Sequence, residues 1–92
     1  GVSSAGPRWE LDIERERQAV YIDFSIERAP ARERWTVRIA KNGSSILTTS
    51  VVTDRDGEAD VSRRIGDTSA PDTFSVRATS ELGEVCRASM RI

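Results

Sequence analysis

Three carboxylates alternate through a turn-forming stretch in the middle of the chain. Asp54, Asp56 and Glu58 occupy every second position on either side of Gly57. Carboxylate oxygens that converge on a turn are ligands that a hard cation such as calcium accepts. A calcium loop needs more ligands at fixed offsets, however, and the guanidinium of Arg55 opposes a cation. We therefore interpret the stretch as a solvated turn and keep a metal site at these three carboxylates as an alternative.

Groups that could carry out catalysis are scarce. The sequence has no histidine, which removes the commonest general base and the commonest metal ligand together. The serines therefore lack a base, and the only lysine, Lys41, lies beside a turn where a Ser–Lys pair would stay solvated. No glycine-rich phosphate cradle is present. We predict no catalytic residues, no cofactor and no enzyme activity.

Charge and composition exclude several partner classes. The 92 residues carry 14 basic and 15 acidic side chains, for a net charge of −1. A domain that binds nucleic acid usually has a clear basic excess, so we expect no nucleic-acid partner. No apolar run approaches the length of a membrane span, and no transmembrane segment is predicted. Every basic residue except Lys41 is an arginine, whose rigid fork suits carboxylates and phosphates.

Cys86 is the only cysteine, so no disulfide can close within the chain. Its position on an apolar strand face predicts a small buried hydrophobic residue. A free thiol or a bridge to another chain is the alternative. The chain begins with Gly1 rather than Met, and we expect a processed or excised product, so the lack of a signal peptide says little about the compartment.

Apolar and polar residues alternate with a period of two along most of the chain. This pattern predicts strands with one buried and one solvated face. The pairs Asn42-Gly43 and Asp56-Gly57 predict two-residue hairpins, and 81–83 predicts a hairpin loop with Gly83 in the left-handed conformation. The predicted strands span residues 9–14, 20–27, 35–40, 45–53, 58–65, 74–79 and 86–92. Their number and spacing predict a single all-β domain over residues 1–92, a seven-stranded antiparallel β-sandwich.

Two of these strands are less regular than the rest. In the stretch 45–53 the apolar residues fall at both odd and even positions, which a bulge or an edge position would explain. In 58–65, Arg63 shares the face of the apolar residues. Trp9 has the same parity as Leu11 and Ile13, so we place it in the core.

Trp35 on the third strand and Phe74 at the start of the sixth resemble the core pattern of immunoglobulin and fibronectin type III domains. The paired cysteines and the tyrosine corner of immunoglobulin domains are absent. The resemblance implies an immunoglobulin/fibronectin-III-like sandwich and says nothing of activity.

A second resemblance is carried by four stretches spread over the chain, namely 3–11, 34–39, 42–43 and 83–87. They are similar to small exported domains of unassigned function from high-GC Gram-positive bacteria. The resemblance implies an extracellular or cell-envelope location. Such domains often carry a cysteine near their start, where Ser3 or Ser4 stands here, which would leave Cys86 as the unpaired half of a lost bridge.

Acidic and basic residues lie on the outward faces of different sheets if strands one, two and five form one sheet and strands three, six and seven form the other. The outward positions of the first sheet are then acidic, with Arg64 the only basic one: Glu10, Asp12, Glu14, Asp23, Glu27, Glu58 and Asp60. The outward positions of the second sheet carry no acid and five arginines: Arg34, Arg38, Arg77, Arg87 and Arg91.

We therefore predict a monomeric, non-catalytic module for binding or structural spacing, whose Arg-rich face binds an acidic partner. The partner is an acidic protein surface, an anionic polymer of the cell envelope, or the acidic face of another copy. Charge carried only for solubility is the alternative interpretation of this face. The alternative functions are an intracellular accessory domain that binds a protein, a calcium-dependent module and a small enzyme.

Overall fold

Seven β-strands make up the regular structure of the computed structural model, which describes residues 7–17, 19–66 and 71–92. Ser3 and Ser4, on which the lost-bridge hypothesis depends, lie outside these residues. The strands are β1 (Arg8–Glu16), β2 (Ala19–Glu27), β3 (Arg34–Lys41), β4 (Ser44–Val52), β5 (Ala59–Gly66), β6 (Thr73–Ser80) and β7 (Val85–Arg91). No helix long and apolar enough to cross a membrane occurs among the described residues.

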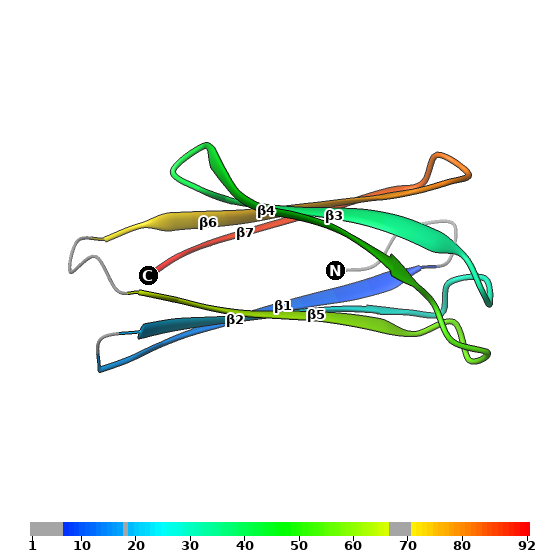
Figure 1. The fold of residues 1–92 in the computed structure, drawn as a ribbon, viewed down its shortest axis with the longest axis horizontal. Coiled ribbons are helices and arrows are strands. Elements are labelled where there is room, and N and C mark those ends of the chain that lie inside the picture. Colours follow the sequence, from blue (N-terminus) through cyan, green and yellow to red (C-terminus); the bar gives the residue numbers. More distant parts are fainter. Residues whose placement is uncertain (1–6, 18, 67–70) are drawn as a thin grey trace.

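The strands form two antiparallel sheets that lie one above the other (Figure 1). One sheet has the order β1-β2-β5 and the other has the order β4-β3-β6-β7. The predicted all-β fold of seven strands is confirmed, as is the division of strands one, two and five from strands three, six and seven. The fourth strand pairs with the third.

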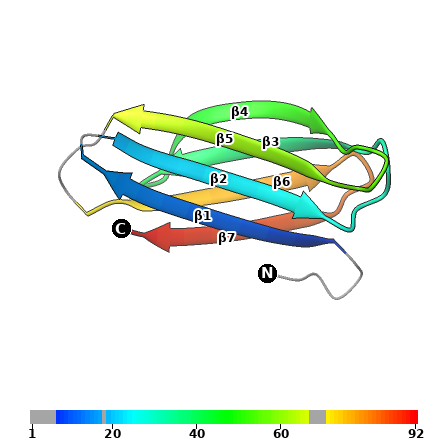
Figure 2. The same cartoon turned by 90° about the horizontal axis from the view of Figure 1, so that it is seen from below.

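The core lies between the sheets and is made by the inward positions of the alternating pattern. Phe24 on β2, Trp35 on β3 and Phe74 on β6 are its largest members, and all three are fully buried. Trp9 is half-buried and packs against this core. Its Nε1 donates a hydrogen bond of 3.1 Å to the carbonyl oxygen of Arg87 and so joins β1 to β7, which lie side by side in Figure 2.

Two of the three predicted hairpin turns are confirmed. Asn42 and Gly43 have φ of 51° and 87°, as a two-residue hairpin requires, and they join the paired strands β3 and β4. Gly83 has φ of 96° in the loop that joins β6 and β7. The hairpin predicted at Asp56-Gly57 is wrong, because β4 and β5 belong to different sheets and this turn carries the chain from one sheet to the other.

The two irregular strands, β4 and β5, are edge strands of their sheets. In the ladder of β3 and β4 the register shifts between Ile39 and Ala40, which leaves Ile46 as the extra residue of a bulge on β4. Arg63 on β5 lies opposite the buried Ile22 and is nevertheless exposed, because β5 has no neighbour on its outer side. A bulge and an inward-pointing charge both discourage pairing with a further strand.

Candidate functional site

The outward face of the four-stranded sheet brings three arginines into one line. Arg38 on β3 lies directly opposite Arg77 on β6, and Arg77 lies directly opposite Arg87 on β7. All three residues are exposed. Neighbouring strands are about 4.8 Å apart, so three guanidiniums share a strip about 10 Å long at its base. We call Arg38, Arg77 and Arg87 the Arg row.

Within the described part of the chain, no counter-charge accompanies the Arg row. No ion pair or side-chain hydrogen bond joins its guanidiniums to any other residue that the structure describes. The rows on either side hold uncharged residues at the outward positions: Thr36, Thr79 and Val85 on one side, and Ala40, Ser75 and Ser89 on the other. Like charges directly opposite one another on a sheet are destabilising, so an anion on this face would relieve a repulsion.

A shallow hollow of about 470 Å³ lies beside the Arg row. The three arginines border it, and Ala40, Ser75 and Ser89 contribute to its lining. Gly43, in the turn between β3 and β4, borders it as well. The hollow exists because small side chains follow the arginines on three adjacent strands, and it combines positive charge with hydroxyl groups.

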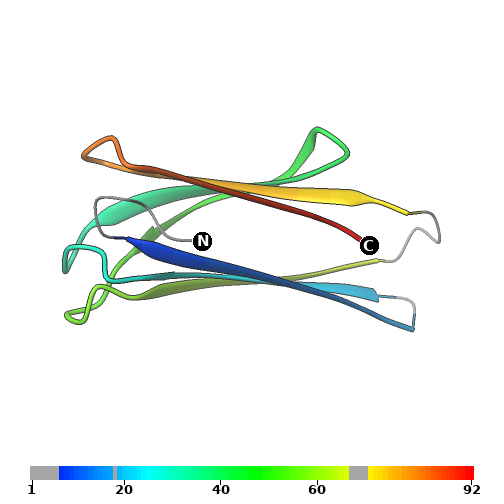
Figure 3. The same ribbon diagram turned by 180° about the vertical axis from the view of Figure 1, so that it is seen from behind.

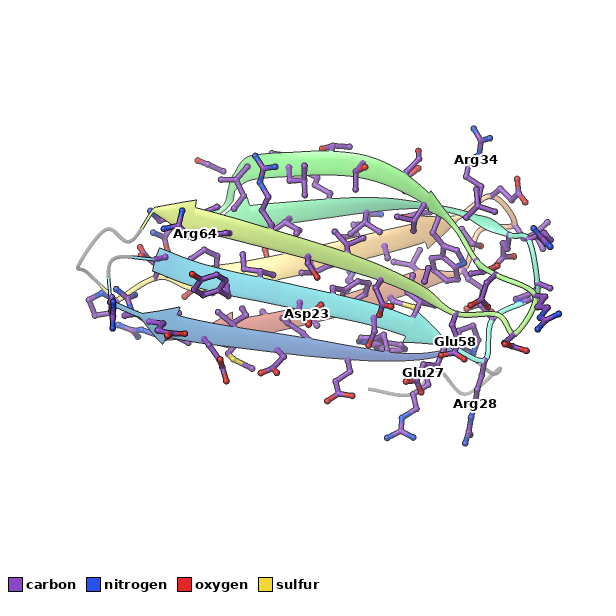
Figure 4. All side chains as sticks on the ribbon, turned by 60° about the horizontal axis from the view of Figure 1, so that its bottom comes forward. Asp23, Glu27, Arg28, Arg34, Glu58 and Arg64 are labelled. Atoms are coloured by element: carbon purple, nitrogen blue, oxygen red, sulfur yellow. The ribbon has the colours of Figure 1, made fainter. Side chains whose placement is uncertain are left out.

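The other two predicted arginines do not join the Arg row. Arg34 lies opposite Val52 and Arg91 lies opposite Thr73. Each is four residues along its strand from a member of the row, which is about 13 Å. Because β3 and β7 run in the same direction, Arg34 and Arg91 lie at opposite ends of the face, and Figure 4 shows Arg34 at the rim of the molecule.

The outward face of the three-stranded sheet is mainly acidic. Asp12 lies opposite Asp23, and in the next row Glu10 and Asp60 flank Ser25. On the other side of the Asp12–Asp23 row, Glu14 is exposed on β1 opposite Tyr21. Figure 4 shows Asp23 over the middle of β2, with Glu27 and Glu58 near one end of the sheet and Arg64 near the other.

Two details of the predicted acidic face need correction. Glu58 precedes β5 and lies in the turn rather than on a strand face. Arg8 also has outward parity, opposite Glu27, so Arg64 is not the only basic residue on this face. The guanidinium of Arg64 lies over the ring of Tyr21, 5.9 Å from its centre, and its Nε donates to the Tyr21 hydroxyl oxygen at 3.3 Å.

Of the three carboxylates predicted as an alternative metal site, that of Asp54 makes hydrogen bonds within its own turn. The Oδ1 atom of Asp54 accepts hydrogen bonds from the backbone N–H groups of Asp56, at 2.8 Å, and Glu58, at 3.0 Å. Among the described residues, no group of three or more carboxylate, thiol or imidazole side chains is placed to hold a metal ion. The structure thus does not bring Asp54, Asp56 and Glu58 together as ligands.

Cys86 is fully buried on the inward face of β7, as predicted for a small hydrophobic residue, and it is a free cysteine. Burial raises the pKa of its thiol to about 11. A thiol in this state is a poor nucleophile at neutral pH, because the thiolate is the reactive form.

Sequence reasoning missed two buried acids, and both continue the inward parity of a strand. Asp72 has the inward parity of Phe74 and is 4% exposed. Its Oδ1 accepts a 2.8 Å hydrogen bond from the side-chain amide of Asn42. Its Oδ2 lies 3.9 Å from Nη2 of Arg15 and 3.9 Å from Nζ of Lys41. Glu33 shares the parity of Trp35. Extending the alternation past the strand ends would have identified both residues.

Glu33 is 3% exposed, and its carboxylate has no hydrogen-bond partner among the described residues. Burial raises the pKa of the Glu33 carboxyl above its ordinary value of 4.5, and the carboxylates of Glu81 and Glu84 raise it further. The indole N–H of Trp35 lowers the pKa of Glu33, although it does not form a hydrogen bond of ordinary geometry with the carboxylate. Glu33 is therefore a buried acid whose charged form is disfavoured by its surroundings.

No protein-family model and no curated protein sequence matches this chain. Among solved structures, it is similar to β-glucosidase 3B from Thermotoga neapolitana in complex with α-D-glucose, with 12% identity and a TM-score of 0.48 over 94% of this chain. The glycerol complex of that enzyme gives 13% identity and a TM-score of 0.48 over 100% of this chain. The matches span only 16% and 17% of the glucosidase chain, and neither likeness bears on activity.

Proposed function

We propose that this chain is a non-catalytic binding module that holds an acidic partner on the Arg row, within an exported or cell-envelope protein. We further propose that its sandwich is of the immunoglobulin/fibronectin-III class. In constant immunoglobulin domains the fourth strand joins the sheet of the first, second and fifth. Here β4 lies beside β3 in the other sheet, which favours the fibronectin type III-like form.

The observation that carries the proposal is the placement of Arg38, Arg77 and Arg87 at directly opposed positions, with no counter-charge from any residue whose position the structure gives. A guanidinium binds a carboxylate through two parallel hydrogen bonds, so each member of the row offers a bidentate site. Acidic groups of a partner supply the charge that the chain itself does not place there. The absence of acids from the outward positions of this sheet makes the whole face attractive to such a partner.

Solubility alone is a weaker explanation of this arrangement. A surface that serves solubility intersperses both signs of charge. The Arg row does the opposite, because it gathers one sign at the positions where cross-strand repulsion is strongest. The chain is close to neutral overall, so the row is a local feature and not the result of a general basic excess.

The proposal is tested by titration with poly-L-glutamate at low salt, followed by calorimetry. The test variant replaces Arg38, Arg77 and Arg87 by Ser. The control variant replaces Arg8, Arg55 and Arg63 by Ser, which changes the net charge equally but leaves the row intact. Exposed ion pairs contribute little each, so we expect loss of all three to weaken binding about tenfold, with the control close to the parent.

The proposal fails if the parent does not bind poly-L-glutamate, or if both variants lose binding equally. Melting curves of the three proteins check that each is folded. Export is tested separately, by immunodetection of the native protein in culture-medium and envelope fractions. Its presence only inside the cell would overturn the proposed location.

A further inference from the structure

We infer that the partner of the Arg row is a linear anionic glycan with a carboxylate on successive sugar rings, and that one ring occupies the hollow beside the row. This inference rests on the proposed function and names the partner class. It depends on two features that lie side by side on the same face: a line of positive charge, and a mainly apolar hollow that this line borders and to which Ser75 and Ser89 add hydroxyl groups.

The line of charge suits a repeating polymer. The guanidiniums start from strands about 4.8 Å apart, so they recur at short, regular steps across the sheet. A polymer with one carboxylate on each repeating unit presents negative charge in the same periodic way. Successive carboxylates then meet successive members of the Arg row, and each contact uses the planar fork of one guanidinium.

The hollow suits a sugar ring better than it suits an amino-acid side chain. Its volume of about 470 Å³ has room for a small ring, and the hydroxyls of Ser75 and Ser89 both donate and accept hydrogen bonds. The side chain of Ala40 in the lining is short, so a sugar ring can approach the backbone of the sheet. The exposed large hydrophobic residues that would anchor a peptide lie outside the hollow: Tyr21, Val52, Leu82 and Val85.

Arg91 supports the placement of the polymer on this side of the row. On β7 the outward residues run from Arg87 through Ser89 to Arg91, which lies opposite Thr73 and is exposed. The hollow, which includes Ser89, therefore has the Arg row on one side and a further guanidinium beyond the other. A glycan that runs along the Arg row with one ring in the hollow therefore has positive charge on both sides of that ring.

Other acidic macromolecules fit less well. Single-stranded nucleic acid binds on stacking platforms of aromatic side chains, and the outward positions of β3, β4, β6 and β7 hold none. A second copy would offer the outward face of its three-stranded sheet, where Asp12 and Asp23 stand on paired strands. That broad strand face cannot enter the hollow, so it would leave Ser75 and Ser89 unused.

The experiment compares alginate oligosaccharides, which carry a carboxylate on every ring, with poly-L-glutamate and single-stranded DNA of matched charge and with neutral dextran. Sedimentation of the protein alone at low and high salt measures self-association. Ser75→Ile fills the hollow from β6 and leaves every arginine in place. Thr79→Ile is the matched control, because it lies on the same strand and face but on the other side of the row. Ala40→Leu fills the same hollow from β3 and serves as a second variant if Ser75→Ile folds poorly.

We expect the parent to bind alginate more tightly than poly-L-glutamate and not to bind dextran. Filling the hollow should weaken alginate binding about tenfold, whereas poly-L-glutamate binding should change by less than about twofold in either hollow-filling variant. Thr79→Ile should behave as the parent. Arg91→Ser should weaken alginate binding by less than the loss of the Arg row.

Equal binding of alginate and poly-L-glutamate, with no effect of filling the hollow, would overturn the glycan and leave the acidic-partner proposal standing. Salt-sensitive self-association that the triple Arg variant abolishes would also overturn the glycan, since the partner is then a second copy. Preference for single-stranded DNA over alginate would likewise replace it. If the parent binds neither alginate nor poly-L-glutamate, both proposals fall.

Discussion

Gly57, in the turn from β4 to β5, lies directly against the backbone of Ala29, in the loop from β2 to β3. The N–H of Ala29 donates a 3.1 Å hydrogen bond to the carbonyl oxygen of Gly57. Gly57 has φ of 76°, and a Cβ atom at this position would overlap the carbonyl oxygen of Ala29. Figure 3 shows these two loops together at one end of the molecule, where they join the two sheets.

Replacing Gly57 by Ala should therefore destabilise the fold strongly. The left-handed backbone costs an L-residue about 1–2 kcal/mol, and the overlap with Ala29 adds to that cost. We expect a loss of at least about 2 kcal/mol in the free energy of unfolding, measured by urea denaturation. Gly43→Ala is the control, because φ is 87° there but nothing lies within 4 Å of the added Cβ. Equal losses in the two variants would show that the loops do not meet as described.

Glu33→Gln should stabilise the protein at neutral pH. The pKa of Glu33 is raised in the folded state, so its protonated form favours folding. That contribution is fully present below the unfolded value of 4.5 and is lost as the pH rises through the folded value. The difference in unfolding free energy between Glu33→Gln and the parent should thus be small at pH 4 and grow towards pH 7. A constant difference across this range would argue that Glu33 is not a buried, unpartnered acid.

The thiol of Cys86 should resist modification in the folded protein. With full burial and a pKa of about 11, on the order of one molecule in a thousand carries the thiolate at pH 8. Ellman's reagent should therefore label Cys86 slowly in buffer and within seconds in concentrated urea. Rapid stoichiometric labelling of the native protein would place Cys86 at the surface instead.

Arg77→Thr should raise stability slightly, because Arg77 stands between Arg38 and Arg87. Like charges on opposed positions cost up to about 1 kcal/mol, and salt screens this repulsion. We expect a gain of about 0.5 kcal/mol in the free energy of unfolding at low salt, shrinking at high salt. Arg8→Thr is the contrast, since Arg8 lies opposite Glu27 and its loss should bring no gain. A loss of stability in Arg77→Thr would mean that the row is a structural element.

The strands and their faces could be predicted because the signals for them are local. Alternation of side chains fixes which residues point inward, as for Trp35, Val37 and Ile39. The turn at Asn42-Gly43 has positive φ at both positions, which few residue pairs tolerate. The same local signal failed at Asp56-Gly57. A hairpin and a crossing between sheets both use a glycine with positive φ, and only the partner of β5 distinguishes them.

The buried acids and the Arg row show two further limits of sequence reasoning. Asp72 and Glu33 continue the inward alternation beyond the ends of β6 and β3, where polar residues by themselves predict a solvated loop. The five arginines of the predicted face all point outward by parity, but parity does not give register. Only register separates the three arginines that share a row from Arg34 and Arg91, which lie at opposite ends of the face.

By itself, the sequence determined the number of strands, the inner and outer faces and the burial of Cys86, because each depends on neighbours a few residues away. Tertiary structure decided which strands are adjacent and in what register. It placed Arg38 in one row with Arg77 and Arg87, which follow it by 39 and 49 positions in the chain. Such proximity comes from hydrogen bonds between distant strands, and no local pattern of residues encodes it.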